Sequence, residues 1–271
     1  MTALSIHNLS VHAWGAVLIN QLTLDLEAGE LLAIIGPNGA GKTSLINTIV
    51  NAGHKGQAVS GELSVCGRPY HQWSPKHRAK QLAVLPQLNT LNFPFTVNEV
   101  VQLGRIPHQT GVKIDNDIIE AALAALDISH LKQRLYTQLS GGEKQRVQLA
   151  RVMTQIWRSE DVYSDIDSES KQNDQRVLLL DEPTSSLDLG HQQQLMKIIR
   201  GFADQGVAIV IVAHDVNLVA NHADKIVALS CGEVMAQGSP EEVITVELIK
   251  KLYQVDASVM KHPVTNKPVV V

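Results

Sequence analysis

Aromatic side chains, cysteines and long apolar runs are all scarce in this sequence. Phe, Trp and Tyr make up 4% of its 271 residues, so aliphatic side chains must build the core. The two cysteines, Cys66 and Cys231, form no C-x-x-C pair, and we expect two reduced thiols in a cytosolic protein. No apolar run approaches the roughly 20 residues that cross a bilayer, and the N-terminus lacks the pattern of a signal peptide. Work at a membrane would therefore require docking to a protein that spans it.

An excess of positive charge is missing as well. The chain has 23 Lys and Arg residues against 27 Asp and Glu residues, a formal net charge of -4. Nucleic-acid binding needs a basic face for phosphate contacts, so the composition disfavours nucleic acid as a partner. With 44% hydrophobic and 18% charged residues, the chain is globular and long enough for one large domain or two small ones.

A complete phosphate-binding pattern stands in the first fifth of the chain. Residues 36–43 read GPNGAGKT and match G-x-x-x-x-G-K-[ST] at each fixed position. An apolar block at Leu31–Ile35 precedes them, and apolar residues at helical spacing follow at Leu45, Ile46 and Ile49. Strand, glycine loop and helix together form the context of a nucleotide site. We therefore predict a nucleoside triphosphate site rather than an ordinary glycine-rich turn.

The chemistry of this loop assigns a role to each residue type. Glycines let successive backbone N–H groups converge on an anion, and the helix N-terminus adds partial positive charge. Lys42 can reach the terminal phosphates, and the Thr43 hydroxyl can join a Mg²⁺ shell. The residues predicted to bind ATP here are Gly36, Pro37, Asn38, Gly39, Ala40, Gly41, Lys42, Thr43 and Ser44.

A second apolar strand ends in two carboxylates. Val177–Leu180 is followed directly by Asp181 and Glu182. Asp181 can hold Mg²⁺ through water, and Glu182 can polarise the attacking water as a general base. An apolar-Asp-Glu string alone is weak, but paired with the phosphate loop it predicts nucleotide hydrolysis.

Residues 139–146, between these two motifs, read LSGGEKQR. Ser140 would be a good helix N-cap by itself, but the whole string and its position resemble the signature of the ATP-binding cassette (ABC) ATPases. The resemblance implies that Ser140, Gly141 and Gly142 face the γ-phosphate held by a second subunit. Two copies would then sandwich two ATP molecules head to tail, and neither site would be complete in a monomer.

The same resemblance implies roles for three further residues. Gln87 occupies the Q-loop position, where it would sense Mg²⁺ and the γ-phosphate and link the core to a helical insert. Asp188 ends a D-loop that would cross the dimer interface beside the nucleotide, and His214 would hydrogen-bond the γ-phosphate and position the water. Trp14 stands where the family places an aromatic residue that stacks on adenine; a partly exposed core tryptophan is the alternative.

We predict an α/β fold: a P-loop ATPase core with a mixed sheet, an N-terminal antiparallel β-subdomain and an inserted helical subdomain. One ABC ATPase domain would span 1–271, with its core at 1–86 and 175–271 and its helical subdomain at 87–157. The periodicities predict strands at 4–11, 18–26, 177–180, 207–213, 225–230 and 233–237, and helices at 97–104, 116–126 and 142–157. Pro240, capped by Ser239, is predicted to open the final helix.

Residues 159–174 carry six acidic residues against one lysine. Such a segment cannot bury enough apolar surface to offset its ordering entropy, so we predict an acidic, solvated and mobile surface loop. The alternative is a cation site on Asp165, Asp167 and Glu169. Ser170 disfavours it, because an EF-hand needs glycine at that position.

Several segments resemble the haemin-importer branch of the family, namely residues 92–101, 104–108, 147–153, 187–192 and 262–265. The resemblance implies an ATPase subunit that works as a homodimer at the cytoplasmic face of the bacterial inner membrane. It would lie beneath two permease subunits, and a periplasmic binding protein would deliver the cargo.

Three alternatives remain beside haemin import. Within the same group, the cargo could be an iron-siderophore or cobalamin. A soluble ABC ATPase acting on nucleic acid or ribosomes is disfavoured because Gln87 to Ser140 leaves room only for a compact insert, and the chain has one phosphate loop. A non-hydrolysing scaffold is disfavoured by the presence of Glu182 and His214.

Overall fold

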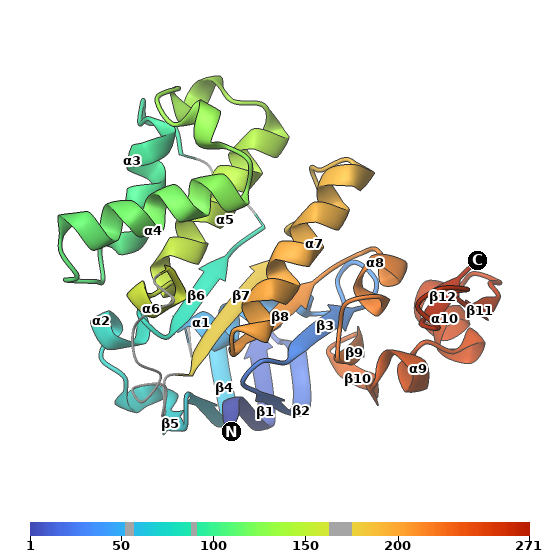
Figure 1. The fold of residues 1–271 in the computed structure, drawn as a ribbon. Coiled ribbons are helices and arrows are strands. Elements are labelled where there is room, and N and C mark those ends of the chain that lie inside the picture. The colour runs from blue at the N-terminus through green and yellow to red at the C-terminus, as the bar shows by residue number, and fades with distance from the viewer. Residues whose placement is uncertain (52–56, 88–90, 163–174) are drawn as a thin grey trace.

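A six-stranded mixed sheet forms the centre of the molecule (Figure 1). The computed structural model describes residues 1–51, 57–87, 91–162 and 175–271. The strand order is β10-β9-β3-β8-β7-β6, with β10 antiparallel to β9 and the other pairs parallel. The strands are β3 (Leu31–Ile35), β6 (Leu82–Leu85), β7 (Arg176–Asp181), β8 (Val207–Val212), β9 (Lys225–Ser230) and β10 (Glu233–Gly238). The predicted mixed sheet is confirmed.

The central strands are apolar throughout because both faces of the sheet are covered. Alternate residues of β3 belong to two hydrophobic clusters: Leu31, Ala33 and Ile35 to one, Leu32 and Ile34 to the other. The first cluster contains the helical insert and helices α7 (Leu189–Asp204) and α8 (Val216–Ala220). The second contains helix α1 (Lys42–Asn51) and the N-terminal strands.

The N-terminal strands form an antiparallel sheet, as predicted, in the order β2-β1-β4-β5. Its members are β1 (Thr2–Ala13), β2 (Ala16–Glu27), β4 (Gln57–Val65) and β5 (Arg68–Pro69). The first two strands are longer than the alternation predicted, because they pair along almost their whole length into a tight hairpin. The β4 and β5 strands were not predicted.

The helical insert lies beside the β6 edge of the central sheet, in the upper left of Figure 1. It contains α3 (Val97–Gln102), α4 (Val112–Ala125) and α5 (Gly141–Ile156), with short 3₁₀ turns at Leu103–Arg105, Ser129–Leu131 and Tyr136–Gln138. Reciprocal capping boxes start α3 at Thr96 and α5 at Ser140. The three helices were predicted, but α4 begins four residues earlier than the sequence pattern indicated.

The C-terminal region differs from the prediction in one respect. Ser239 caps a helix that opens at Pro240, as predicted, but this helix, α9 (Pro240–Val243), is not the last. A second helix, α10 (Val246–Tyr253), follows with its own cap at Thr245, and a small hairpin of β11 (Val259–Lys261) and β12 (Pro268–Val270) comes after it. Short helices α2 (Pro75–Arg78) and α6 (Ser159–Val162) and a 3₁₀ turn at Tyr70–Gln72 complete the fold.

The first four residues of the acidic segment are folded, which corrects the prediction of a solvated loop for residues 159–162. Residues Ser159–Val162 form α6, and Asp161 makes an ion pair with Arg176 at the start of β7. Both side chains of this pair are about nine-tenths buried. The remaining residues of the segment, including Asp165, Asp167 and Glu169, lie outside the described residues.

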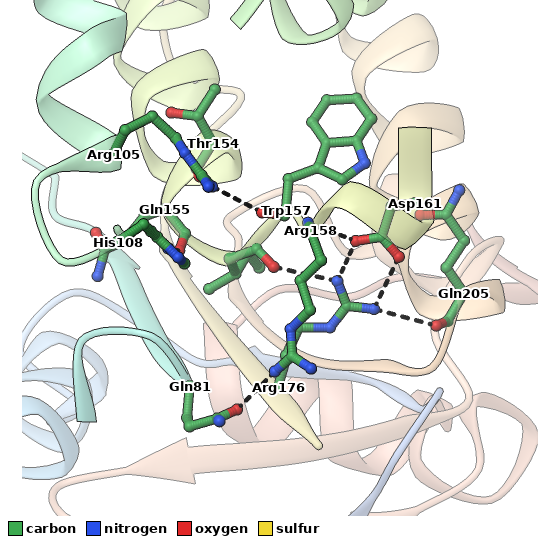
Figure 2. A network of polar contacts seen from close by, with 11 residues as sticks. Gln81, Arg105, His108, Thr154, Gln155, Trp157, Arg158, Asp161, Arg176 and Gln205 are labelled. Carbon is green, nitrogen blue, oxygen red and sulfur yellow. Dashed lines mark hydrogen bonds and ion pairs between the residues drawn. The ribbon is translucent and has the colours of Figure 1, made fainter. Parts of the chain in front are cut away.

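Buried arginines hold the C-terminal end of α5 (Figure 2). Arg105 donates from Nη1 to the carbonyls of Thr154 and Trp157, at 2.7 and 2.8 Å. Arg176 donates from Nη1 to the carbonyl of Ile156 at 3.1 Å. These are the carbonyls that a helix leaves unpaired at its C-terminus, and cations are favoured there. We call this network the anchored end of α5.

Within the described part of the chain, no helix combines the length and the apolar character that a membrane crossing requires.

Candidate functional site

The phosphate loop connects β3 to α1, and two of its positions can hold only glycine. Gly36 has φ of +148°, and a Cβ there would lie 2.1 Å from the carbonyl oxygen of Leu229. Gly41 has φ of +103°, and a Cβ there would lie 2.6 Å from the carbonyl oxygen of Leu18. A hydrogen bond from the turn after β9 also holds the loop in place, because the Gly232 N–H donates to the Ala40 carbonyl at 3.0 Å. Backbone therefore encloses the loop on the side away from its opening.

Lys42 folds over the loop that it follows. Its Nζ donates to the carbonyls of Gly36 and Pro37 at 2.8 and 3.0 Å, and the residue is 6% exposed. Burial lowers the pKa of this ammonium group, while the carboxylates of Glu182 and Asp181 act in the opposite direction. A buried ammonium held only by neutral carbonyls fits an anionic ligand, because phosphate oxygens would give it a stronger, charge-assisted bond.

Asp181 ends β7 at the floor of the same site and is 2% exposed. Burial raises its pKa, a hydrogen bond with Thr43 opposes that rise, and the charge of Glu182 adds to it. Its Oδ1 has no hydrogen-bond partner among the described residues. A buried carboxylate oxygen without a partner, next to a threonine hydroxyl, is a donor set that suits a hard cation such as Mg²⁺.

Glu182, the next residue, is held by two side chains. Gln87 donates from Nε2 to Glu182 Oε2 at 2.8 Å, and His214 Nε2 lies 2.5 Å from Glu182 Oε1. The three residues follow β6, β7 and β8, which are neighbours in the parallel part of the sheet, so their carboxyl ends meet at one edge. The structure thus brings together the three residues predicted to be catalytic.

The backbone of Glu182 has an unusual conformation. Its φ is +53°, in the left-handed region that glutamate rarely adopts. Such a residue costs about 1–3 kcal/mol and persists only where the surroundings determine it. Here its N–H donates to the Val212 carbonyl at 3.0 Å, and its own carbonyl accepts from the Gln145 side chain at 3.1 Å.

The signature residues lie at the N-terminus of α5. Ser140 accepts from the Glu143 N–H at 3.4 Å, and its own N–H donates to Glu143 Oε2 at 2.7 Å. These bonds with Ser140 hold the pKa of Glu143 below its ordinary value. Ser140 is exposed, and in the described part of the chain it makes no hydrogen bond to the phosphate loop. Ser140, Gly141 and Gly142 therefore contribute to no single-chain site with Lys42.

Asp188 and Trp14 also lie outside the cluster around Lys42 and Glu182. Asp188 caps α7, accepting from the His191 N–H at 2.9 Å, and any contact with nucleotide stays a prediction. Trp14 is 89% exposed at the two-residue turn between β1 and β2, where it and Gly15 both have positive φ. The alternative of a partly exposed core tryptophan is therefore wrong, while stacking on adenine stays a prediction.

Sequence reasoning missed Gln145. Its amide donates to the Glu182 carbonyl at 3.1 Å and accepts from the Ser186 N–H at 3.2 Å. It lines a cavity of about 180 Å³ between the helical insert and the core, together with Gln87 and Asp181. The only signal in the sequence was its place inside LSGGEKQR, which by itself does not specify what the side chain contacts.

Comparisons with known proteins agree with this geometry. The family model described as ABC transporter matches residues 19–156. The Hemin import ATP-binding protein HmuV of Plesiomonas shigelloides is 42% identical over 260 residues, which cover 96% of this chain and 98% of that protein. The protein of the same name from Pseudomonas entomophila (strain L48) is 40% identical over 268 residues, covering 99% of each chain.

Solved structures show the same architecture. A metal-chelate type ABC transporter in an inward-facing conformation superposes with a TM-score of 0.77 at 26% identity, over 100% of this chain and 96% of that chain. An ATP-binding cassette of an ABC transporter in its ADP conformation superposes with a TM-score of 0.74 at 20% identity, over 94% of this chain and 98% of that chain, and supports the fold alone.

Proposed function

Because the chain belongs to the ABC transporter family, and is therefore an ATP-binding subunit that hydrolyses ATP, we propose that it powers the import of haemin into a bacterial cell. Relatives named for hemin import match it over nearly their whole length. The structural observation that carries the ATPase assignment is the convergence of Gln87, Glu182 and His214 beside Lys42 and its glycine loop.

The loop at 36–43 and Ser44 hold the phosphates of ATP. Backbone N–H groups and the N-terminus of α1 supply the neutral and dipolar part of this site, and Lys42 supplies its charge. Lys42 exchanges the carbonyls of Gly36 and Pro37 for phosphate oxygens when ATP enters. Trp14, which is exposed, stacks on the adenine ring.

Thr43, Asp181 and Gln87 are the residues that would hold Mg²⁺. When bound, the ion would neutralise part of the negative charge on the phosphate oxygens. The partnerless Oδ1 of buried Asp181 supports this assignment, since such an oxygen gains a partner when a cation is bound.

Glu182 is the general base of hydrolysis. Its carboxylate takes a proton from the water that attacks the γ-phosphorus, and the products are ADP and phosphate. In the structure both of its oxygens accept from other residues, Oε2 from Gln87 and Oε1 from His214. These two side chains turn towards the γ-phosphate and its water when ATP is bound, and this releases the carboxylate.

Two copies of the chain form the working unit. Ser140, Gly141 and Gly142 lie at an exposed helix N-terminus that is chemically suited to an anion but is not joined to the phosphate loop of its own chain. A second copy supplies the missing γ-phosphate, and Asp188 lies in the loop at that interface. Each ATP is then held between Lys42 of one protomer and Ser140 of its partner.

The dimer acts at the cytoplasmic face of the inner membrane, beneath two permease subunits, and a periplasmic binding protein delivers the haemin. Residues 1–86 and 175–271 serve as the nucleotide-binding core, and the helical subdomain at 87–157 conveys its movement to the permease. Gln87, which stands between the two parts and contacts Glu182, is suited to that link.

Reconstitution with its permease in proteoliposomes tests the proposal. Haemin-loaded binding protein should stimulate ATP hydrolysis and haemin uptake, and Glu182→Gln should abolish both while the complex still assembles. Stimulation by a ferric siderophore or cobalamin complex, with none by haemin, would reassign the cargo. Failure to co-purify with any polytopic membrane protein would reject the transporter role itself.

A further inference from the structure

We propose that Gln145 is a positioning residue that ties the catalytic Glu182 to the signature helix of the same subunit. Through it, phosphate bound at Ser140 would control the carboxylate that hydrolyses the other ATP. The inference rests on the paired sites of the proposed function, but the contacts that carry it are all within one chain.

The amide of Gln145 uses both of its ends on one loop. Nε2 donates to the Glu182 carbonyl at 3.1 Å, while Oε1 accepts from the Ser186 N–H at 3.2 Å. A side chain bonded at both ends cannot rotate without losing one of the two bonds. The loop from Glu182 to Ser186 is therefore held in one position relative to α5.

This restraint acts on the strained residue of the site. The φ of +53° at Glu182 is maintained by bonds to its backbone: its N–H to Val212, and its carbonyl to Gln145 and to the Ser185 hydroxyl, at 3.1 Å in both cases. The Ser185 N–H also donates to this carbonyl, at 3.3 Å. Without Gln145 the carbonyl keeps these bonds within its own loop but loses its bond to α5, so the peptide after Glu182 can rotate more readily towards a conformation of lower energy. Such a rotation would carry the carboxylate away from Gln87 and His214.

The position of Gln145 along α5 makes it suited to transmit movement. It lies five residues after the cap Ser140, about one and a half turns into the helix. The far end of α5 is the anchored end, where Arg105 and Arg176 hold its last carbonyls (Figure 2). A ligand at Ser140 can therefore shift the first turns of α5 more than its last turn.

The surroundings of Gln145 leave room for that shift. The cavity of about 180 Å³ lies against Gln145, Gly141 and Ser186. Close-packed interfaces resist displacement, because contacts are lost when side chains separate. The open space between α5 and the loop therefore allows the first turns of the helix and the loop to move together.

The same loop is held from its other side by a second glutamine. Gln192, on α7, donates from Nε2 to the carbonyls of Thr184 and Leu187, at 3.2 and 3.1 Å. It matches Gln145 in residue type and makes two bonds as well, one to the loop and one to Leu187 directly after it, but it belongs to a helix that carries no signature residue. It is therefore the matched control.

The experiment compares Gln145→Met, Gln145→Glu and Gln192→Met in the full chain, each assembled with the permease. Methionine keeps the length of the side chain and removes both bonds, while glutamate keeps the acceptor for Ser186 and loses the donor to Glu182. We measure kcat, the KM for ATP, the Hill coefficient for ATP and the melting temperature. The first variant should lower kcat about tenfold, with KM within about twofold and a Hill coefficient near 1.

The glutamate variant should lower kcat at least as far, because it also loses the bond to Glu182 and places a negatively charged oxygen against that carbonyl. Gln192→Met should keep the Hill coefficient of the wild type. Wild-type kcat and Hill coefficient in Gln145→Met would overturn the proposal, as would an equal loss of cooperativity in Gln192→Met. A wild-type complex that hydrolyses ATP without cooperativity would instead remove the paired sites on which the proposal rests. Any variant that melts below the assay temperature is assayed after cooling, with bound fluorescent ATP giving the folded fraction.

Discussion

The two ends of the α5 and β7 pair show what distinguishes a structural site from a reactive one. At the anchored end, Arg105 is paired with Asp115 and Arg176 with Asp161, and both arginines also bond helix carbonyls. At the reactive end, β7 finishes in Asp181 and Glu182, and Lys42 is the nearby buried cation. Charges at the first end are matched by the chain itself, whereas the second end gains its remaining partners from a ligand.

Replacing the carboxylate at the reactive end should have the largest effect. Glu182→Gln keeps the shape and one acceptor but cannot take a proton, so kcat should fall about a thousandfold. ATP binding should be retained, and a long-lived ATP-bound dimer should accumulate. Phosphate release and size-exclusion chromatography with ATP measure the two effects. Turnover at the wild-type rate would remove Glu182 from the mechanism.

The anchored end should respond in stability instead of rate. Arg176→Met removes the guanidinium that pairs with the buried Asp161 carboxylate and leaves it the Arg158 N–H at 2.9 Å, so the free energy of unfolding should fall by about 3 kcal/mol. The kcat measured well below the melting temperature should not change. Urea unfolding and ATPase assays test this difference.

Arg200→Met is the control for that experiment, because Arg200 makes more exposed ion pairs with Asp204 and Asp224. Its loss should cost less than about 1 kcal/mol. A loss of kcat in Arg176→Met at temperatures where the variant is fully folded would contradict the separation of the two ends.

Removing the cation of the reactive end should have a smaller effect than removing its base. Lys42→Ala loses the charge-assisted bonds to phosphate, and ATP affinity should fall by about 2 kcal/mol, roughly thirtyfold. Titration with a fluorescent ATP analogue gives the affinity. Unchanged binding would show that the backbone of the loop alone holds the phosphates.

A histidine beside the anchored end should produce the smallest effect. Burial lowers the pKa of His108, as do the charges of Arg105 and Lys80, while its hydrogen bond to the Gln155 carbonyl opposes them. The unfolded chain therefore takes up this proton first as pH falls. Stability from this group is complete above the unfolded value of about 6.5 and is lost as pH falls below it.

Urea unfolding at pH 8 and pH 5.5 measures that loss, and His108→Gln should lose less stability on acidification than the wild type. The exposed His71 provides the control. The free energy of unfolding should differ between pH 8 and pH 5.5 by the same amount in His71→Gln and in the wild type. The same pH dependence in His108→Gln and the wild type would show that His108 makes no contribution.

The sequence predicted the elements whose determinants are local. The phosphate loop could be found because its pattern is contiguous in the sequence, although Gly36 and Gly41 are required by the distant carbonyls of Leu229 and Leu18. The apolar blocks predicted β7, β8 and β9 because buried parallel strands have no polar face. Five strands among the described residues were not predicted: β5, β6, β11 and β12 have only two to four residues each, and Gly61 interrupts the alternation of β4.

The remaining features depend on contacts between distant residues. Gly61 has a φ of +98°, and a Cβ there would lie 2.5 Å from the carbonyl oxygen of Asn8. The requirement for glycine at this position therefore comes from a neighbouring strand, β1. Helix α7 was not predicted. It starts directly after Asp188, and because the residues of its first turns are mostly polar, the buried apolar residues further along did not stand out as a helical pattern. The bridge from Gln145 to Glu182 joins residues 37 positions apart, and periodicity carries no information on such a pair.

In the structure, Gln87 and His214 engage both carboxylate oxygens of Glu182. As long as they stay there, neither oxygen of this carboxylate is free to withdraw a proton from water. On the proposed function, a subunit that has not yet taken up ATP would therefore hold no free base, and its reactivity would appear only once the substrate is in place.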